Sequence, residues 1–236
     1  MMFLNTYIVD VLLNILKGAK ITLIVFGLTL LSSIPLGMLG SILKRVNFRP
    51  FKVLKGNKFF KFLANFNPLR FILDIYTWII RGTPLLLQLF FVLYGIPIIF
   101  KISLDRFTAA LITFIINYSA YFIEIFRGGM DSISKGQFEA CKVLSFTKSQ
   151  MYLYVILPQT FKKTLPTIAN ESINLIKDTA LMASIAIADL LMIAKEEVNH
   201  SFRFEAYFVA AIVYLFLTYF IVFVFKKIEK KYNFYN

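Results

Sequence analysis

The sequence GQFEAC at residues 136–141, followed by VILP at residues 155–158, stands out within an otherwise apolar chain. Both pieces belong to a partly polar segment, residues 128–158, that separates runs long enough to cross a bilayer. Nothing in this segment resembles an active site. A chain that leaves the membrane to build such a segment and then returns presents that segment to a partner. We therefore expect any motor activity to lie on another chain.

The composition identifies an integral membrane protein. Of the 236 residues, 58% are hydrophobic and 17% are charged, whereas soluble domains are nearer 45–50% apolar. The length suits a single all-α membrane domain over residues 1–236. The net charge of +13 would suggest nucleic acid in a soluble protein, but here cytoplasmic loops account for it, so no nucleic-acid partner is expected. The one cysteine excludes an intrachain disulfide.

Apolar runs predict about five transmembrane helices, at Ile21–Leu43, Pro84–Ile99, Phe107–Phe126, Pro158–Ile176 and Ala206–Phe225. A short helix from Phe71 precedes the second crossing, and Pro84 favours a break after it, at residues 81–84. Residues 101–106 form a short outer turn. Residues 180–194 are expected to form a shorter apolar helix or a re-entrant piece, and residues 195–205 an outer loop.

Cations set the topology. Residues 44–70 carry eight Lys and Arg without a single acid, and further lysines follow the last apolar run, so both regions are expected in the cytoplasm. The N-terminus is then outside and the C-terminus inside. Lys52, Lys55, Lys58 and Lys61 are three residues apart, which is typical of a basic amphipathic helix on the membrane surface. A solvated loop that only fixes topology is the alternative.

Small residues recur every four positions in the first predicted crossing, at Ser33, Gly37 and Ser41. Such a stripe lets a second helix approach closely. We therefore expect tight helix packing along this face.

Three stretches carry a resemblance to a known family. The first is RGTPLLLQLFF at residues 81–91. The second is RGGM at 127–130 followed by KGQFEA at 135–140. The third contains ILPQ at 156–159, LP at 165–166, NE at 170–171, Asn174, and KDTAL at 177–181. In this order and spacing, they resemble the membrane subunit of ATP-binding-cassette importers, specifically the polar amino acid family that includes histidine, glutamine, arginine and cystine permeases. The resemblance covers residues 17–229 and implies the transmembrane-domain fold of type I importers.

The resemblance assigns residues 128–158 as a cytoplasmic coupling segment. The family motif is E-A-A, three residues, G, nine residues, I, one residue, and L-P. This chain departs from the motif at three positions. Cys141 replaces the second alanine, Ser145 replaces the glycine, and Val155 replaces the isoleucine. Because residues other than glycine resist positive φ, the serine puts a sharp turn in doubt. The residues expected to couple to the ATPase are Gly136, Glu139, Ala140, Cys141, Ser145, Leu157 and Pro158.

The same resemblance implies the partners and the location. These are two ATP-binding-cassette ATPase subunits, a second permease subunit that is identical or homologous, an extracytoplasmic substrate-binding protein and an amino acid cargo, in a bacterial plasma (inner) membrane. The chain has no G-x-x-x-x-G-K-[ST] phosphate loop, so it is not the ATPase itself. It is expected to be a non-catalytic subunit without a cofactor of its own, and ATP is bound by the partner.

Polar residues within apolar runs are costly and therefore functional candidates. Thr167, Glu171, Asn174 and Asp178 lie along one face of a helix, with Asn170 beside it. A zwitterionic amino acid needs an acid for its ammonium group and a donor or cation for its carboxylate. The expected substrate path comprises Arg81, Gln88, Asn170, Glu171 and Asn174. Interhelical hydrogen bonds, and local pairing of Lys177 with Asp178, are the structural alternatives.

Two other functions remain open from the residues alone. The same machinery could carry an opine or a short peptide, and a stand-alone carrier or channel would need no ATPase. An intramembrane enzyme is disfavoured, because His200 falls in a predicted outer loop and Cys141 in the coupling segment.

Overall fold

The computed structural model describes residues 2–50, 57 and 64–232, and every regular element in these ranges is helical. The long helices are α1 (Met2–Leu43), α6 (Arg106–Asp131), α9 (Leu157–Asp178) and α11 (Glu205–Tyr232). Shorter pieces connect them: α3 (Pro68–Gly82), α4 (Leu85–Phe90), η1 (Phe91–Gly95), α5 (Ile96–Phe100), α7 (Lys135–Val143), α8 (Lys148–Gln150), η2 (Met151–Ile156), η3 (Thr179–Ile185) and α10 (Leu190–Ser201).

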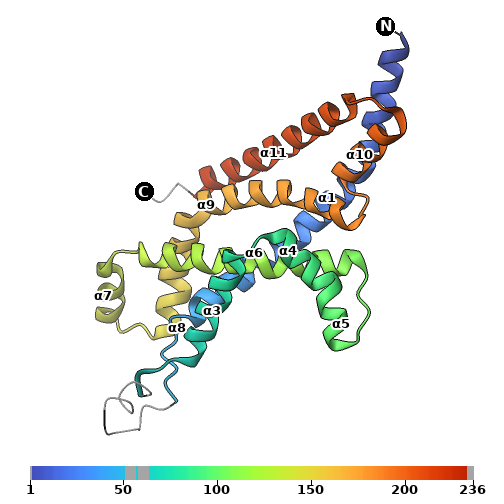
Figure 1. The fold of residues 1–236 in the computed structure, drawn as a ribbon. Coiled ribbons are helices and arrows are strands. Elements are labelled where there is room, and N and C mark those ends of the chain that lie inside the picture. The colour runs from blue at the N-terminus through green and yellow to red at the C-terminus, as the bar shows by residue number, and fades with distance from the viewer. Residues whose placement is uncertain (1, 51–56, 58–63, 233–236) are drawn as a thin grey trace.

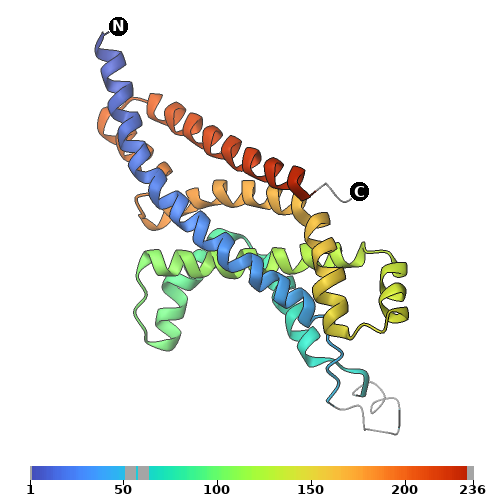
Figure 2. The same ribbon diagram turned by 180° about the vertical axis from the view of Figure 1, so that it is seen from behind.

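Helix α6 lies at the centre of the arrangement (Figure 1). It contacts α1, α3, α4 and α9, and its contact with α1 is the most extensive in the chain. Seen from behind, α1 runs obliquely across α6 and on to α10 and α11 near its N-terminal end (Figure 2). Helix α11 packs beside α9, and α7 projects beyond the C-terminal end of α6. The chain is therefore an elongated helical assembly organised around α6.

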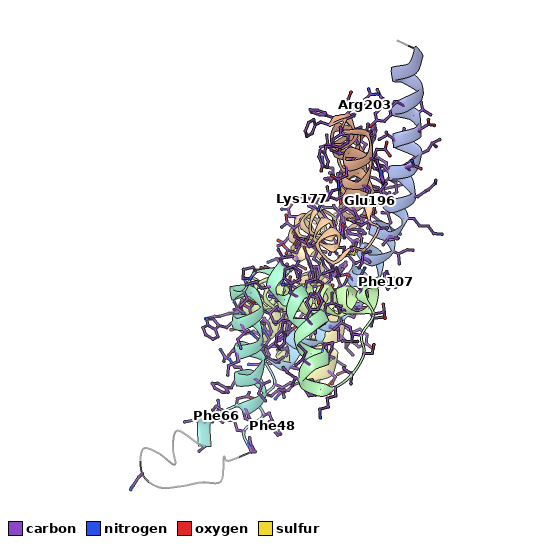
Figure 3. All side chains as sticks on the ribbon, turned by 45° about the vertical axis from the view of Figure 1, so that its right-hand side comes forward. Phe48, Phe66, Phe107, Lys177, Glu196 and Arg203 are labelled. Atoms are coloured by element: carbon purple, nitrogen blue, oxygen red, sulfur yellow. The ribbon has the colours of Figure 1, made fainter. Side chains whose placement is uncertain are left out.

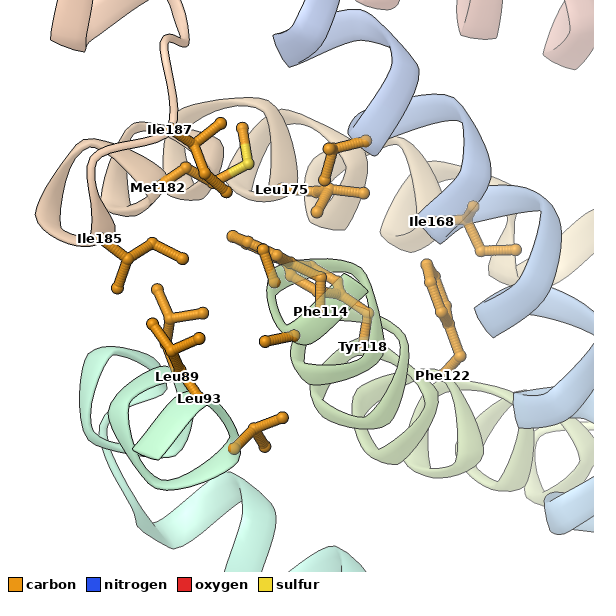
Figure 4. Packing of buried hydrophobic residues seen from close by; sticks show 14 of the residues in the cluster. Leu89, Leu93, Phe114, Tyr118, Phe122, Ile168, Leu175, Met182, Ile185 and Ile187 are labelled. Carbon is orange, nitrogen blue, oxygen red and sulfur yellow. The ribbon is translucent and has the colours of Figure 1, made fainter. Parts of the chain in front are cut away.

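The main core lies where α6 meets α4, η1, α9 and η3 (Figure 4). Phe114, Tyr118 and Phe122 point from successive turns of α6 and are almost completely buried. Because they are spaced by four residues, they form one continuous ridge along the helix. Because α6 is a membrane-spanning helix, this ridge contributes mainly through close van der Waals packing against the neighbouring helices. A second core joins the N-terminal half of α1 to α10 and α11.

The small-residue stripe predicted in α1 packs closely against α6, as expected. Ser33 and Ser41 are fully buried. A Cβ atom added to Gly37 would lie only 2.9 Å from the carbonyl carbon of Phe122. The backbones of α1 and α6 therefore approach each other at a point where no side chain fits between them.

Ionic contacts join α1, α3 and α6 at one end of the molecule. The Lys44 ammonium group contacts the carboxylates of Asp74 at 2.8 Å and Glu124 at 2.7 Å, and donates to the Thr77 hydroxyl at 3.0 Å. Only 4% of the Lys44 side chain is exposed. Because a buried ammonium group without partners is very costly, this contact requires the three helix ends to stay together.

The predicted membrane class is confirmed, and the described residues contain three helices long and apolar enough to span a membrane. These are Tyr7–Leu43, α6 and α11. The pair formed by α3 and residues 85–100 is bent by 107° at the predicted break and can serve as a fourth span. Helix α9 corresponds to the remaining predicted crossing. It has 22 residues, enough for ~33 Å, but hydropathy alone does not select it because of its polar residues.

Several predicted boundaries were wrong. Helix α1 begins at Met2, well before Ile21, and α6 continues to Asp131. Residues 180–194 form two pieces, η3 and the start of α10, separated by Ala186 in a left-handed conformation. The predicted outer loop is helical as far as Ser201. Asp189 caps the start of α10 by accepting from the Met192 amide at 2.9 Å, and the apolar side of α10 packs in the core with α1 and α11. The predicted basic helix with Lys52, Lys55, Lys58 and Lys61 lies outside the described residues.

The crossing of α1 and α6 predicts unequal effects of two glycine substitutions. Gly37→Ala should lower the free energy of unfolding by about 2 kcal/mol, because the added methyl group pushes against the backbone of α6. Gly27→Ala in the same helix meets nothing within 4 Å and should be neutral or stabilising by up to about 1 kcal/mol. Unfolding in detergent, followed by circular dichroism, measures both. Equal effects at the two positions would contradict the close approach.

Candidate functional site

Residues 128–158 form a compact lobe between the end of α6 and the start of α9. It has its own small core, in which Met130, Ile133 and Ile156 are buried. Phe138 of α7 and residues of η2 pack against them. Cys141 is 3% exposed, so the small apolar side chain that replaces the motif's second alanine faces inward. The predicted cytoplasmic segment is thus a folded unit rather than an open loop.

Polar contacts fix this lobe to α9. The Gln159 amide donates to the Gln137 side-chain oxygen at 3.0 Å, and the Lys163 ammonium group donates to the Ser132 carbonyl at 2.8 Å. A Cβ atom added to Gly129 of α6 would lie 3.1 Å from Thr160 of α9, so these two helices also pack closely. Leu157 and Pro158 form the first turn of α9, where a proline is well tolerated. A displacement of the lobe would therefore act directly on α6 and α9.

The turn after α7 is sharp despite the serine. Ser145 has φ of 55°, in the left-handed region. The Phe146 amide donates to the Cys141 carbonyl and the Ser145 amide to the Lys142 carbonyl, each at 2.9 Å. These two bonds are the Schellman arrangement that closes a helix with a left-handed residue. The sharp turn therefore forms even though serine replaces the glycine of the motif. The Cβ atom of Ser145 makes its left-handed backbone conformation less favourable than it would be for glycine.

Several large apolar side chains protrude from the outer surface of the lobe. Val143 and Leu144 at the end of α7 are 84% and 67% exposed, and Leu153 and Tyr154 of η2 are 60% and 72% exposed. The motif residues Gly136, Glu139 and Ala140 are also exposed. Apolar side chains that protrude from a polar, folded lobe mark a protein interaction surface.

The break between α3 and α4 is held by one glutamine. The Gln88 amide nitrogen donates to the carbonyl of Ile80 at 2.8 Å and to the carbonyl and hydroxyl of Thr83 at 3.1 and 2.8 Å. Its oxygen accepts from the amide of the buried Asn117 at 2.9 Å. Backbone groups freed at a break must be satisfied inside a membrane protein, and Gln88 supplies this function. The contacts of Gln88 with the protein already use its donor and its acceptor.

A polar cluster lies beside this break, formed by α3, α6 and α9. The Arg81 guanidinium lies over the Tyr121 ring, 5.4 Å from its centre, and is close enough to Glu171 to interact with it electrostatically. Tyr118 donates its hydroxyl to the Asp178 carboxylate at 2.7 Å. The Asn174 amide lies 3.4 Å from the Glu171 carboxylate.

The structure thus places three of the five expected path residues, Arg81, Glu171 and Asn174, in one cluster. Asn170 is exposed on α9 beside them, whereas Gln88 belongs to the helix break. Sequence reasoning missed Tyr118 and Tyr121 of α6. Their spacing of three residues puts both on one helix face, which is the only signal that could have indicated them. Asp178 accepts a hydrogen bond from Tyr118 of α6, so its observed partner lies on another helix and not at the neighbouring Lys177.

Comparison with known proteins gives the family. A model described as the binding-protein-dependent transport system inner membrane component matches residues 62–233. The chain belongs to this family. The match includes the lobe of residues 128–158, the helix break and the polar cluster.

Relatives are named as amino acid permeases. The chain is 33% identical to the arginine transport system permease protein ArtQ of Bacillus subtilis, over 92% of this chain and 91% of ArtQ. It is 33% identical to the glutamine transport system permease protein GlnP of Escherichia coli, over 92% of each. A solved structure titled as an amino acid ABC transporter with histidines matches 92% of this chain and 94% of its own, at a TM-score of 0.78 and 29% identity. The methionine transporter MetNI, at 16% identity and a TM-score of 0.67, supports the fold alone.

The strained turn after α7 predicts a stabilising substitution. Ser145→Gly should raise the free energy of unfolding by about 1 kcal/mol, because glycine adopts positive φ without a steric cost. Ser145→Val should lower it by a similar amount or more, because a β-branched side chain resists this conformation. Thermal unfolding of the two purified variants measures both changes. If glycine and valine had the same effect, Ser145 would not carry strain.

Proposed function

We propose that this chain is the permease subunit of an ATP-driven importer that carries a polar amino acid across a bacterial plasma membrane. In this proposal the chain pairs with a second permease subunit, two ATPase subunits and an extracytoplasmic substrate-binding protein. The N-terminus lies outside and the C-terminus in the cytoplasm. The observation that carries the proposal is the folded lobe with exposed Val143, Leu144 and Tyr154, joined rigidly to α6 and α9.

The lobe suits the transmission of force. An ATPase that binds α7 and closes on ATP would move the lobe as one rigid body. The core of the lobe and the Gln137–Gln159 hydrogen bond hold the lobe together during this movement. The movement would reach α9, which carries Glu171, through the packed contact of Gly129 with Thr160. In this way a distant ATP cycle can change access to the polar cluster without any catalytic residue in this chain.

The polar cluster suits an amino acid. Glu171 offers a carboxylate to the cargo ammonium group, and Arg81 offers a guanidinium to the cargo carboxylate, with Asn170 and Asn174 as neutral donors. Opposite charges on one face of a path match the two ends of a zwitterion. An opine or a short peptide carries the same end groups and is the nearest alternative cargo.

Uptake into proteoliposomes tests the proposal. The chain, co-expressed with its ATPase and second permease subunit and supplied with its binding protein, should accumulate a polar amino acid only when ATP is present. Accumulation by the chain alone, without ATP, would overturn the proposal and support a secondary carrier.

Glu139→Lys tests the docking surface of α7. Reversal of this exposed charge should weaken capture of the ATPase about tenfold, because one charged contact at an interface contributes on the order of 1–2 kcal/mol. Glu196→Lys makes the same change on α10, at the other end of the molecule, and should have no effect (Figure 3). Pull-down of the ATPase from detergent measures capture. Equal capture by both variants would argue against coupling through α7.

Glu171→Gln tests the cargo path. Loss of the carboxylate should reduce ATP-dependent uptake about tenfold, because a hydrogen bond to a charged group contributes about 1.5–3 kcal/mol. Assembly with the ATPase should not change. Glu197→Gln, a partly buried glutamate of α10, is the matched control and should transport normally. Unchanged uptake and cargo preference in the Glu171 variant would remove this residue from the path.

A further inference from the structure

A pocket of about 850 Å³ opens between the ends of α1, α3 and α6, with Tyr152 of η2 on one side. It lies at the same end of the molecule as Phe48 and Phe66, far from Glu196 and Arg203 (Figure 3). Neither the coupling motif nor the polar cluster uses it. We call it the α1–α3–α6 pocket.

The lining of this pocket has an excess of positive charge. Its described residues include five cations and three carboxylates, which leaves a surplus of two positive charges: Lys44, Arg45, Arg49, Arg70 and Arg127 against Asp74, Glu124 and Asp131. Three of the cations neutralise the acids. Lys44 binds Asp74 and Glu124, Arg127 binds Glu124 and Asp131, and Arg45 binds Asp131.

The other two cations, Arg49 and Arg70, and the Nε atom of Arg45 are available to a ligand. Within the described residues, Arg49 donates to the neutral Asn65 side chain at 3.1 Å, and Arg70 is 3.5 Å from Asp74 with two thirds of its side chain exposed. The Nε atom of Arg45 is buried and has no hydrogen-bond partner in this part of the chain. The sequence contains no acid between Lys44 and Leu73, so residues 51–63 bring no carboxylate that could neutralise the surplus.

An apolar path leads away from the pocket. The rings of Phe66 and Phe71, both of which line it, are in contact, with centres 5.3 Å apart and planes tilted by 59°. From Phe71, the exposed side chains of Ile75 and Trp78 continue along α3 at helical spacing. A cationic pocket that opens onto an apolar helix face matches a charged headgroup with acyl chains below it, whereas a soluble anion would gain nothing from that face.

We propose that the α1–α3–α6 pocket binds the phosphate group of an anionic phospholipid, with Arg45, Arg49 and Arg70 around the phosphate and the acyl chains along α3. The ligand would join the ends of three helices next to the coupling lobe. This site is separate from the proposed cargo path, and its test does not depend on transport.

Native mass spectrometry of the purified permease complex with dioctanoyl phosphatidylglycerol tests the site. The double variant Arg49→Gln/Arg70→Gln should bind this lipid about 25-fold more weakly, since each cation near an anionic lipid contributes about fivefold. The matched control Lys227→Gln/Lys230→Gln removes the same charge from exposed positions of α11 and should bind as the unaltered chain does. Arg49→Lys/Arg70→Lys keeps the charge and should retain most of the binding.

Each outcome decides the proposal. Equal loss in the α11 control would show that only net charge attracts the lipid, and equal binding by all variants would show that the pocket is not the site; either result overturns it. Inorganic phosphate that displaces the lipid at equal concentration would assign the pocket to a soluble anion instead of a lipid. If the glutamine variant does not fold, the Arg49→Lys/Arg70→Lys variant is tested with two lipids, phosphatidylglycerol and the zwitterionic phosphatidylcholine. Equal affinity for the two lipids would overturn the proposal.

Discussion

The close crossing of α1 and α6 at Gly37 is the contact on which the rest of the structure depends. Here a side chain larger than hydrogen would meet the backbone of Phe122. With its position set by this crossing, α6 presents its aromatic ridge to α4, η1 and α9, and its C-terminal end carries the lobe. Apolar side chains gain little from meeting each other in lipid, so close backbone packing has to hold these helices together.

Polar groups give the assembly its specific geometry. Lys44 is buried among acids and a hydroxyl, Gln88 satisfies the carbonyls at the bend, and Tyr118 binds Asp178. Each is costly to bury alone, so each contact restricts the helices to the arrangement in which its partner is present. The same principle explains why α9 can carry acidic and amide side chains: it packs against α6 and α11 rather than facing lipid alone.

The lobe of residues 128–158 combines internal rigidity with an outer surface made for contact. Its core and its hydrogen bonds to α9 oppose deformation, while its exposed Val143 and Leu144 would be unfavourable in water without a partner. A movement of the outer surface of the lobe would therefore be passed on to α9 without deforming the lobe. The proposed lipid pocket lies against the other side of this region, where α1 and α6 end and α3 begins, and a bound lipid would oppose the separation of these helices.

The sequence alone was enough to predict the membrane class, the break before Pro84, the small-residue stripe and the family, because hydropathy, proline geometry and motif spacing are local properties. It did not determine how far α1 extends or that α10 replaces a loop, since capping by Asp189 and packing against α1 override local polarity. The sequence had grouped Arg81 with Glu171 in one expected path, and only the tertiary structure brought Tyr118 to them. These residues come from three helices far apart in the sequence, and their proximity depends on the crossings that close packing imposes.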